Sequence, residues 1–256
     1  MVRNHLCKIR VRTNDVDVLV ILTAFYHRIR GLSELWLAFG TGKSFRYIPV
    51  HIIARKIGAH KANALLMFHA LTGCDSNSAF YGISKNKAWS VWQDNPQFTN
   101  AFMFLSRPVG DIPSDISAQI EEFVVRLYLS NEDIVTVNKA RYELFQFSGK
   151  DFDNIPPTQD ALKQHIRHAA YTAGHIWGHA LNIAPALPSP LMWGYQLIND
   201  MLQPVWTTIP TISKKHLKVC HCKIVCKPPC VCAINQVSCT SLCTCRGECY
   251  GLRRDQ

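Results

Sequence analysis

The sequence predicts a mixed α/β protein with three regions: an α/β core over residues 1–95, a mostly helical region over 96–210 and a small metal-binding tail over 211–256. Three observations support this division. Strand-like and helix-like apolar patterns alternate up to about residue 95, and helical patterns dominate from there to a proline-rich stretch. Nine of the 11 cysteines then crowd between residues 220 and 249.

The first region opens with strand-like segments. Residues Lys8–Arg12 alternate polar and apolar side chains with period two, which predicts a strand. The apolar run Val18–Tyr26 fits either a buried strand or the start of a helix. Leu35–Phe39 and Phe45–Ile48 flank a glycine-rich turn, as in a hairpin. That Gly-Thr-Gly-Lys turn lacks the glycine spacing of a phosphate-binding Walker loop.

Helices follow in the first region and through most of the second. Pro49 is expected to start a helix that Gly58 ends, and a second helix is expected over Ala62–Leu71. An amphipathic helix should begin at Ser114, and another should cover Val135–Phe147. Pro156, Pro157 and Thr158 should cap a long helix that runs to Leu181. The prolines and tryptophans after it predict an extended segment on the surface.

Three aspartates are the candidate catalytic residues: Asp15, Asp17 and Asp75. If Asp15 and Asp17 lie on extended chain, residues two apart face the same side. Asp75 follows a helix and could join them from a neighbouring element. Metal-dependent phosphoryl chemistry needs several such carboxylates together, because they hold the divalent ions that activate water. The alternatives are a solvated pair and, for Asp75, a turn residue that bonds its own backbone.

The order of these features resembles the C-terminal half of the flap endonuclease and XPG-like (PIN-fold) nuclease core. The matching residues are Asp15-Val-Asp17, Leu71-Thr-Gly-Cys-Asp75 and Gly82-Ile-Ser-Lys-Asn-Lys-Ala88. The resemblance implies that the three aspartates bind Mg2+ or Mn2+. It also implies a helix-hairpin-helix element in which Gly82 and Ile83 hold the nucleic-acid backbone, with Lys85 and Lys87 beside them.

Two departures limit that resemblance. The second glycine of the family's turn is Ser84 here, which weakens close approach of the backbone to a phosphate. The family's other acidic ligands lie on earlier elements, and the fourteen residues before Asp15 contain no acid. The expectation is therefore a nuclease core that lacks its first half and is catalytically incomplete as this chain.

A second resemblance covers nearly the whole chain. A large, mostly uncharacterised animal family, whose expansion suggests mobile elements, shares five blocks with it and commonly ends in a cysteine-rich tail. The blocks are Phe39–Ile48, Leu71–Trp89, Asn154–Gln159, Ala173–Gly178 and Leu187–Pro190. This resemblance specifies a family and implies little about activity.

The tail contains the candidate zinc ligands. They are Cys220, Cys222, Cys226, Cys230, Cys232, Cys239, Cys243, Cys245 and Cys249. Cys-x-Cys pairs are too close to bridge comfortably, and thiolates favour zinc with four ligands per ion. Six terminal and three bridging thiolates would satisfy three ions, which predicts a Zn3Cys9 cluster.

The cysteine spacing resembles the CXC modules of tesmin-like DNA-binding proteins and the pre-SET cluster of histone methyltransferases. The tesmin-like tyrosine expected before a Cys-x-Cys pair is Pro229 here, so base reading is in doubt. Lys223 and Lys227 are the expected phosphate contacts of the tail. Nine thiolates and three Zn2+ ions would together contribute about −3, which leaves the tail, residues 211–256, with a net charge of about +3. The alternative is a zinc knot that only orders the C-terminus.

Four histidines lie close together in the sequence: His165, His168, His175 and His179. Three of them share one helical face, but the Glu of a His-Glu-x-x-His metalloprotease is absent. We therefore expect packing or solvent-facing histidines and no metal site.

The whole chain of 256 residues carries a formal charge of +10, which favours an anionic partner, with DNA the first expectation. There is no apolar run of membrane-spanning length and no signal peptide, so we expect no membrane contact and a nuclear or cytoplasmic, not secreted, protein. The predicted function is a zinc-binding, nucleic-acid-binding protein derived from a metal-dependent nuclease. The alternative is a non-catalytic interaction scaffold with a structural zinc knot.

Overall fold

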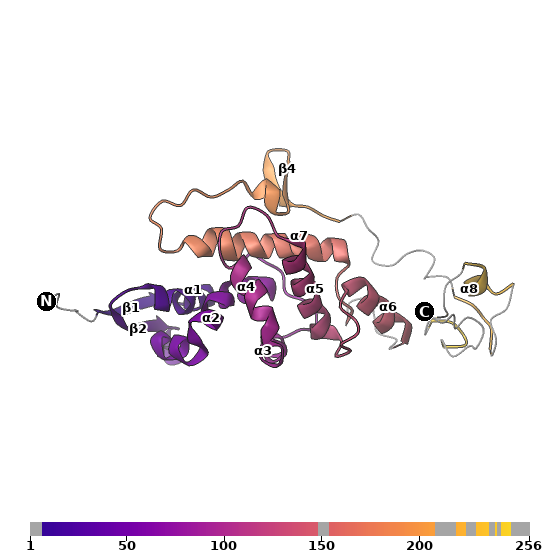
Figure 1. Ribbon diagram of the computed structural model, residues 1–256, viewed down its shortest axis with the longest axis horizontal. Coiled ribbons are helices and arrows are strands. Elements are labelled where there is room, and N and C mark those ends of the chain that lie inside the picture. The colour runs from indigo at the N-terminus through magenta and orange to yellow at the C-terminus, as the bar shows by residue number, and fades with distance from the viewer. Residues whose placement is uncertain are drawn as a thin grey trace.

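The computed structural model describes residues 7–147, 154–207, 219–223, 229–235, 239 and 242–246. It confirms the mixed α/β class. Figure 1 shows a small sheet at the N-terminal end of the chain with a body of helices beside it. Among the described residues, no helix is both long and apolar enough to cross a membrane.

The sheet has three strands in the order β1 (Cys7–Thr13), β2 (Leu32–Phe39) and β3 (Arg46–Pro49). β1 and β2 run parallel and are connected by helix α1 (Val16–Phe25), whereas β2 and β3 form the expected antiparallel hairpin. Alternate residues of the strands, among them Ile9, Val11, Leu35 and Leu37, form a hydrophobic cluster with α1 and the start of α2. One face of the sheet is thus buried.

Helix α2 (Val50–Leu71) connects the sheet to the helical body. It contains the expected break at Gly58, whose backbone is not helical (φ 80°, ψ 155°). Residues before the break, such as Val50 and Ala54, pack in the sheet cluster. Residues after it, from Ala64 to Leu71, pack in the main cluster with the later helices.

The helical body is built from α3 to α7 around aromatic side chains. The helices are α3 (Lys85–Asp94), α4 (Thr99–Leu105), α5 (Ser114–Tyr128), α6 (Val137–Phe147) and α7 (Gln159–Ala170). Phe68 stacks on Trp92 with ring centroids 4.8 Å apart, and Phe102 meets Phe123 edge-on at 4.9 Å. The main cluster includes residues from Ala24 to Trp193, so it contains side chains from both the 1–95 and the 96–210 regions.

The predicted long helix after Thr158 is present but irregular. The Thr158 side chain caps α7, which continues as a π-helical turn (Tyr171–Ile176) and a 3-10 turn (Trp177–His179). Gly174 lies in the π turn, where an added Cβ would be only 2.4 Å from the Arg107 carbonyl oxygen. The two backbones approach so closely that only a glycine fits at this position.

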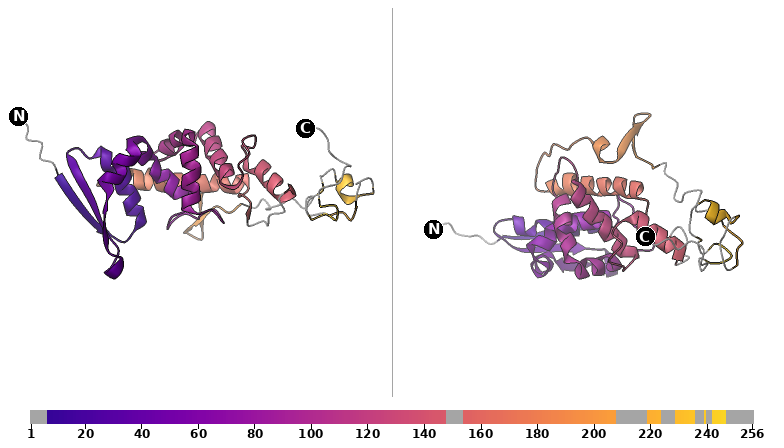
Figure 2. Two further views of the ribbon diagram at one scale, coloured as in Figure 1. Left: turned by 90° about the horizontal axis from the view of Figure 1, so that it is seen from below. Right: turned by 45° about the vertical axis from the view of Figure 1, so that its right-hand side comes forward.

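The proline- and tryptophan-rich segment contains elements that the sequence reasoning missed. A 3-10 turn (Pro190–Trp193) leads into a two-stranded hairpin of β4 (Tyr195–Ile198) and β5 (Met201–Pro204). Both views in Figure 2 and Figure 1 show this segment on the outer side of α7. In the tail, the described residues include a single helical turn, α8 (Val231–Ile234).

Candidate functional site

The three candidate aspartates meet at one place on the surface. One carboxylate oxygen from each of Asp15, Asp17 and Asp75 lies within 4.8 Å of the oxygens of the other two. Asp15 and Asp75 are exposed and Asp17 is half-buried. Carboxylate oxygens are the ligands that Mg2+ and Mn2+ prefer, so this donor set fits one divalent ion.

The way Asp15 and Asp17 come together differs from the expectation of extended chain. Helix α1 begins at Val16, and Asp15 is its N-cap residue: the Asp15 carboxylate accepts a hydrogen bond of 2.7 Å from the Asp17 backbone N–H. An aspartate at this position satisfies a backbone donor that the helix leaves unpaired, which favours the helix over continued strand. Asp17 therefore points from the first turn of the helix.

Asp17 is held by a histidine from α2. The His69 Nε2 atom lies 2.8 Å from Asp17 Oδ1, and both side chains are largely buried. Burial, and then the nearby Lys85, lower the pKa of His69. A neutral imidazole donates one hydrogen bond to the carboxylate without adding a positive charge. The His69 ring also lies against Trp177, with centroids 5.9 Å apart.

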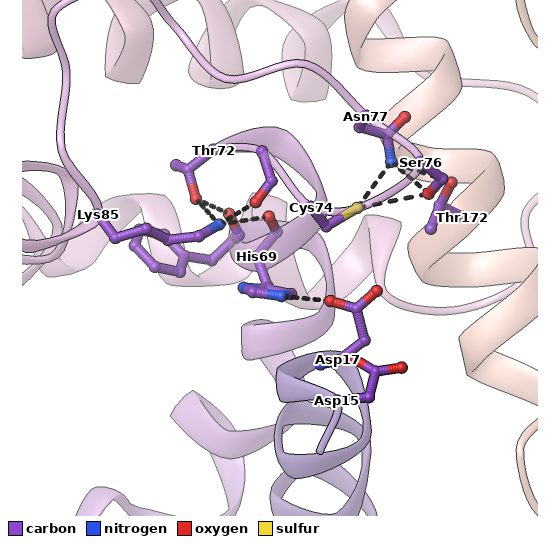
Figure 3. Close-up of polar contacts among 11 residues, drawn as sticks. Asp15, Asp17, His69, Thr72, Cys74, Ser76, Asn77, Lys85 and Thr172 are labelled. Atoms are coloured by element: carbon purple, nitrogen blue, oxygen red, sulfur yellow. Dashed lines mark hydrogen bonds and ion pairs between the residues drawn. The ribbon is translucent and has the colours of Figure 1, made fainter. Parts of the chain in front are cut away.

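Lys85 points into the protein, beneath the loop that carries Asp75. Its Nζ donates to the His69 carbonyl (2.8 Å), the Thr72 hydroxyl (2.8 Å) and the Gly73 carbonyl (2.5 Å), as Figure 3 shows. Burial lowers the pKa of Lys85 to about 8. An ammonium has three donors, so none remains for a phosphate in this conformation. The C-terminal carbonyls of α2 are satisfied instead.

The turn predicted to hold a nucleic-acid backbone contains a glycine in the left-handed conformation. Gly82 is exposed with φ +70°, and Ile83 packs against the main cluster. Ser84, which replaces the family's second glycine, is the N-cap of α3 and accepts from the Lys87 backbone N–H at 3.2 Å. The Lys87 side chain is exposed in the first turn of α3. The backbone contact to a phosphate stays a prediction.

Cysteines of the tail form a buried cluster that could hold a metal ion. One thiol from each of Cys220, Cys232, Cys239 and Cys243 lies within 4.8 Å of the others, and a second group joins Cys220 with Cys222 and Cys230. The Sγ atoms of Cys220 and Cys239 are 3.5 Å apart, and those of Cys232 and Cys243 are 3.7 Å apart. A tetrahedral site with Zn–S bonds of about 2.3 Å separates its sulfurs by about 3.8 Å, which these distances match.

Burial disfavours ionisation of one thiol of the cluster. Burial raises the pKa of Cys232 to about 11, so this thiol ionises at neutral pH only if a positive charge compensates the thiolate. Cys245 also belongs to the cluster, 4.0 Å from Cys220. Lys223 is exposed. The predicted ligands Cys226 and Cys249 and the predicted phosphate contact Lys227 lie outside the described residues.

The histidines of α7 and the following turns have packing roles, as expected. His165 Nε2 bonds to the Leu71 carbonyl at 2.8 Å, and His168 Nε2 bonds to the Gly194 carbonyl at 2.5 Å. His175 is buried beside Trp193, whereas His179 is half-buried. The described residues therefore place the four rings in separate environments.

His69 and the inward direction of Lys85 are the parts of the site that sequence reasoning missed. His69 sits in an apolar helical run, 52 residues from Asp17, and no local spacing relates the two. Lys85 is the first residue of α3, a position at which the sequence pattern predicts an exposed side chain. Its three acceptors are backbone and hydroxyl oxygens, which leave no signature in the sequence.

Comparison with known proteins adds no relative. No protein-family model matches the chain, and neither the curated proteins nor the solved structures contain a significant match.

Proposed function

We propose that the chain is a zinc-binding, nucleic-acid-binding protein derived from a metal-dependent nuclease, with an incomplete catalytic site. The observation that carries this proposal is the buried thiol cluster, in which Cys220 belongs to two groups at once. A shared thiol is what a multinuclear cluster with bridging thiolates requires. The proposed content is three Zn2+ held by the nine cysteines of the tail.

The nucleic-acid part of the proposal rests on charge and on the surface turn at Gly82. The chain carries +10, and the exposed Lys87 and Lys223 could each meet a phosphate. Contacts of this kind release counterions, so affinity should fall steeply with salt. A protein partner with a buried apolar interface would show little salt dependence, which distinguishes the interaction-scaffold alternative.

The zinc content decides the first half of the proposal. Zinc per chain is measured by inductively coupled plasma mass spectrometry and by native mass spectrometry on protein purified without chelator. Three zinc ions per chain are expected. A chain that folds, binds nucleic acid and holds no zinc would overturn this half.

The three aspartates support a second candidate function, cleavage of a phosphodiester. Asp15, Asp17 and Asp75 would hold Mg2+ or Mn2+, which would neutralise phosphate charge and activate water. A second ion would need ligands from another chain or from the nucleic acid itself. The carrying observation is the convergence of three carboxylates from α1 and from the loop after α2.

Cleavage is tested with labelled 5′-flap, single-stranded and duplex DNA in Mg2+ and in Mn2+. Asp75→Ala removes one carboxylate, and Asp94→Asn, an exposed acid on α3, is the matched control. Cleavage that Asp75→Ala abolishes and Asp94→Asn preserves supports a working site. No cleavage by the wild type, with DNA binding intact, leaves a nucleic-acid-binding protein without nuclease activity.

A further inference from the structure

The face of the three-stranded sheet that points away from α1 and α2 is open and carries an unusual set of side chains. Because side chains alternate along a strand, Arg10 and Arg12 of β1 point opposite to Ile9 and Val11, which pack against the sheet cluster. Arg10 and Arg12 are both exposed.

The neighbouring strands add aromatic rings to the same face. The register pairs Arg12 with Ala38 and Ala38 with Tyr47, and it pairs Arg10 with Trp36. Tyr47 is 51% exposed, and Trp36 is half-buried. Neighbouring strands lie about 4.8 Å apart, so the Arg12 and Tyr47 backbones are about 10 Å apart with only the small Ala38 between them.

One cation and two aromatic rings lie together at the end of this face where β1 finishes. The Arg12 guanidinium lies 5.4 Å from the centroid of the Phe45 ring, and Phe45 meets Tyr47 edge-on at 5.2 Å. Phe45 itself is 36% exposed. An edge-on pair leaves a ring face available for a further flat group, and the guanidinium is held beside it by the cation–π contact.

The charge of the face is positive. Glu34 is the only acidic residue of the three strands, and it pairs with Lys8 at 2.6 Å. Arg10 and Arg12 are therefore not balanced by acids within the sheet. Such a surface suits a polyanion that also presents flat apolar groups.

We propose that this sheet face binds single-stranded nucleic acid, with phosphates on Arg10 and Arg12 and bases stacked on Tyr47 and Phe45. The inference rests on the proposed nucleic-acid-binding function and assigns it a site separate from the turn at Gly82 and from the cysteine tail. Single strands fit this chemistry because their bases are free to stack on aromatic rings. Duplex DNA hides those base faces in its own stack.

The position of the face relates it to the aspartates. β1 and β2 are parallel, so their carboxyl ends meet at one edge of the sheet, and Asp15 follows Arg12 by three residues. At about 3.3 Å per residue, that is about 10 Å of extended chain. A strand bound along β1 therefore passes close to the three carboxylates.

The test measures binding by the full chain to a fluorescein-labelled 15-nucleotide oligothymidine and to a 15-base-pair duplex, by anisotropy between 50 and 300 mM NaCl. The double variant Arg10→Gln/Arg12→Gln removes two cations. Lys56→Gln/Lys139→Gln removes two exposed cations from α2 and α6 and is the matched control. Tyr47→Ala removes a ring, and Tyr47→Phe keeps it.

The arginine variant should lower the slope of log K against log salt by about 1.4, at about 0.7 per phosphate contact on a single strand. The lysine control should leave the slope unchanged. Tyr47→Ala should weaken single-strand binding by about 5- to 150-fold, the range measured for lost base stacking, while Tyr47→Phe binds as the wild type does. Duplex binding should change less than single-strand binding.

Cross-linking keeps the test decisive if a variant misfolds. An oligonucleotide with 5-iodouracil is irradiated on the wild-type chain, and the modified peptides are mapped. Modification at Phe45 or Tyr47 supports the proposal. Binding with modification confined to the tail, or sheet variants that bind as the wild type does, overturns this site and leaves the proposed function standing.

Two other results also overturn the inference. A wild-type chain that binds no nucleic acid refutes the site and the proposed function together. Equal displacement of the oligonucleotide by polyglutamate and by unlabelled oligothymidine shows that the face accepts any polyanion, which refutes base stacking as its chemistry.

Discussion

Gly73 fixes the loop that carries Asp75, and replacing it with alanine should disturb both stability and the carboxylate cluster. Its φ is +104°, a conformation that L side chains rarely adopt. A Cβ at this position would lie 2.7 Å from the Ala79 Cβ, 2.8 Å from the Ala79 Cα and 3.0 Å from the Ala79 backbone nitrogen. Because two of those atoms are backbone, the clash is relieved only by moving the loop.

The cost of Gly73→Ala can be worked out from its parts. Backbone strain should lower the free energy of unfolding by about 1–3 kcal/mol, and overpacking against Ala79 should lower it by about 1–3 kcal/mol more. Alanine also reduces the conformational entropy of the unfolded chain, which raises the free energy of unfolding by about 0.4–1 kcal/mol. The free energy of unfolding should therefore fall by about 3 kcal/mol.

Two other glycines separate the contributions. Gly58 has φ +80°, but an added Cβ there meets nothing within 4 Å. Gly58→Ala should therefore introduce backbone strain without a clash, and the free energy of unfolding should fall by about 1 kcal/mol. Gly110 has neither a positive φ nor a neighbour within 4 Å, and Gly110→Ala should cost nothing. Urea unfolding followed by tryptophan fluorescence measures all three. Mn2+ affinity, measured by electron paramagnetic resonance, should fall for Gly73→Ala only.

The reasoning fails if Gly73→Ala is no more destabilising than Gly58→Ala. It also fails if Gly73→Ala lowers stability as expected but leaves Mn2+ affinity at the wild-type value, since the loop would then have moved without moving Asp75.

Three further predictions concern single residues. The pKa of Lys85 is about 8 in the folded chain and near 10.4 in the unfolded chain, so the unfolded chain binds more protons between these pH values. The free energy of unfolding of the wild type should therefore rise relative to that of Lys85→Met as the pH rises from 8 to 10. A difference in urea midpoints that stays flat or falls over this range contradicts the prediction. Cys220→Ser should remove more than one zinc per chain by native mass spectrometry, because Cys220 belongs to both thiol groups, while Cys7→Ser on β1 keeps the full content. Ser84→Ala should lower the free energy of unfolding by about 1 kcal/mol, because it removes the N-cap of α3. The control Ser90→Ala, at an exposed position of the same helix, should change the free energy of unfolding very little. Equal urea midpoints for the two variants would refute the capping role.

Local patterns predicted most of the regular structure. Period-two alternation located β1, the glycine-rich turn located the β2–β3 hairpin, and Gly58 and Thr158 marked a helix break and a helix start. These signals involve neighbours in sequence and need no knowledge of the fold. Elements with such local signals can be predicted from a single sequence.

The β4–β5 hairpin, which the sequence analysis did not predict, has a local signal in its turn. Asn199 and Asp200 both have positive φ, 50° and 59°, and together they form a two-residue turn between apolar pairs. Asn and Asp tolerate this conformation and favour such hairpin turns. The surrounding prolines suggested extended chain instead.

The candidate site depended on contacts that no local pattern encodes. Its aspartates could be proposed through a resemblance, and the structure brings them together. The N-cap role of Asp15 follows from competition between strand and helix, which composition alone did not decide. The bonds of His69 and Lys85 depend on how α1, α2 and α3 pack, and packing is a property of the whole chain.

Helix α2 has a consequence for dissecting the protein into fragments. Its first half belongs to the sheet cluster and its second half to the main cluster, with Gly58 between them. A fragment that begins after Gly58 lacks the sheet and exposes the apolar second half of α2 at its new N-terminus. A fragment that ends at Gly58 keeps the sheet with Val50 and Ala54 but lacks the residues that join it to the main cluster. Because this one helix contributes side chains to both clusters, limited proteolysis of the intact chain should not release the sheet and the helices as separate stable modules.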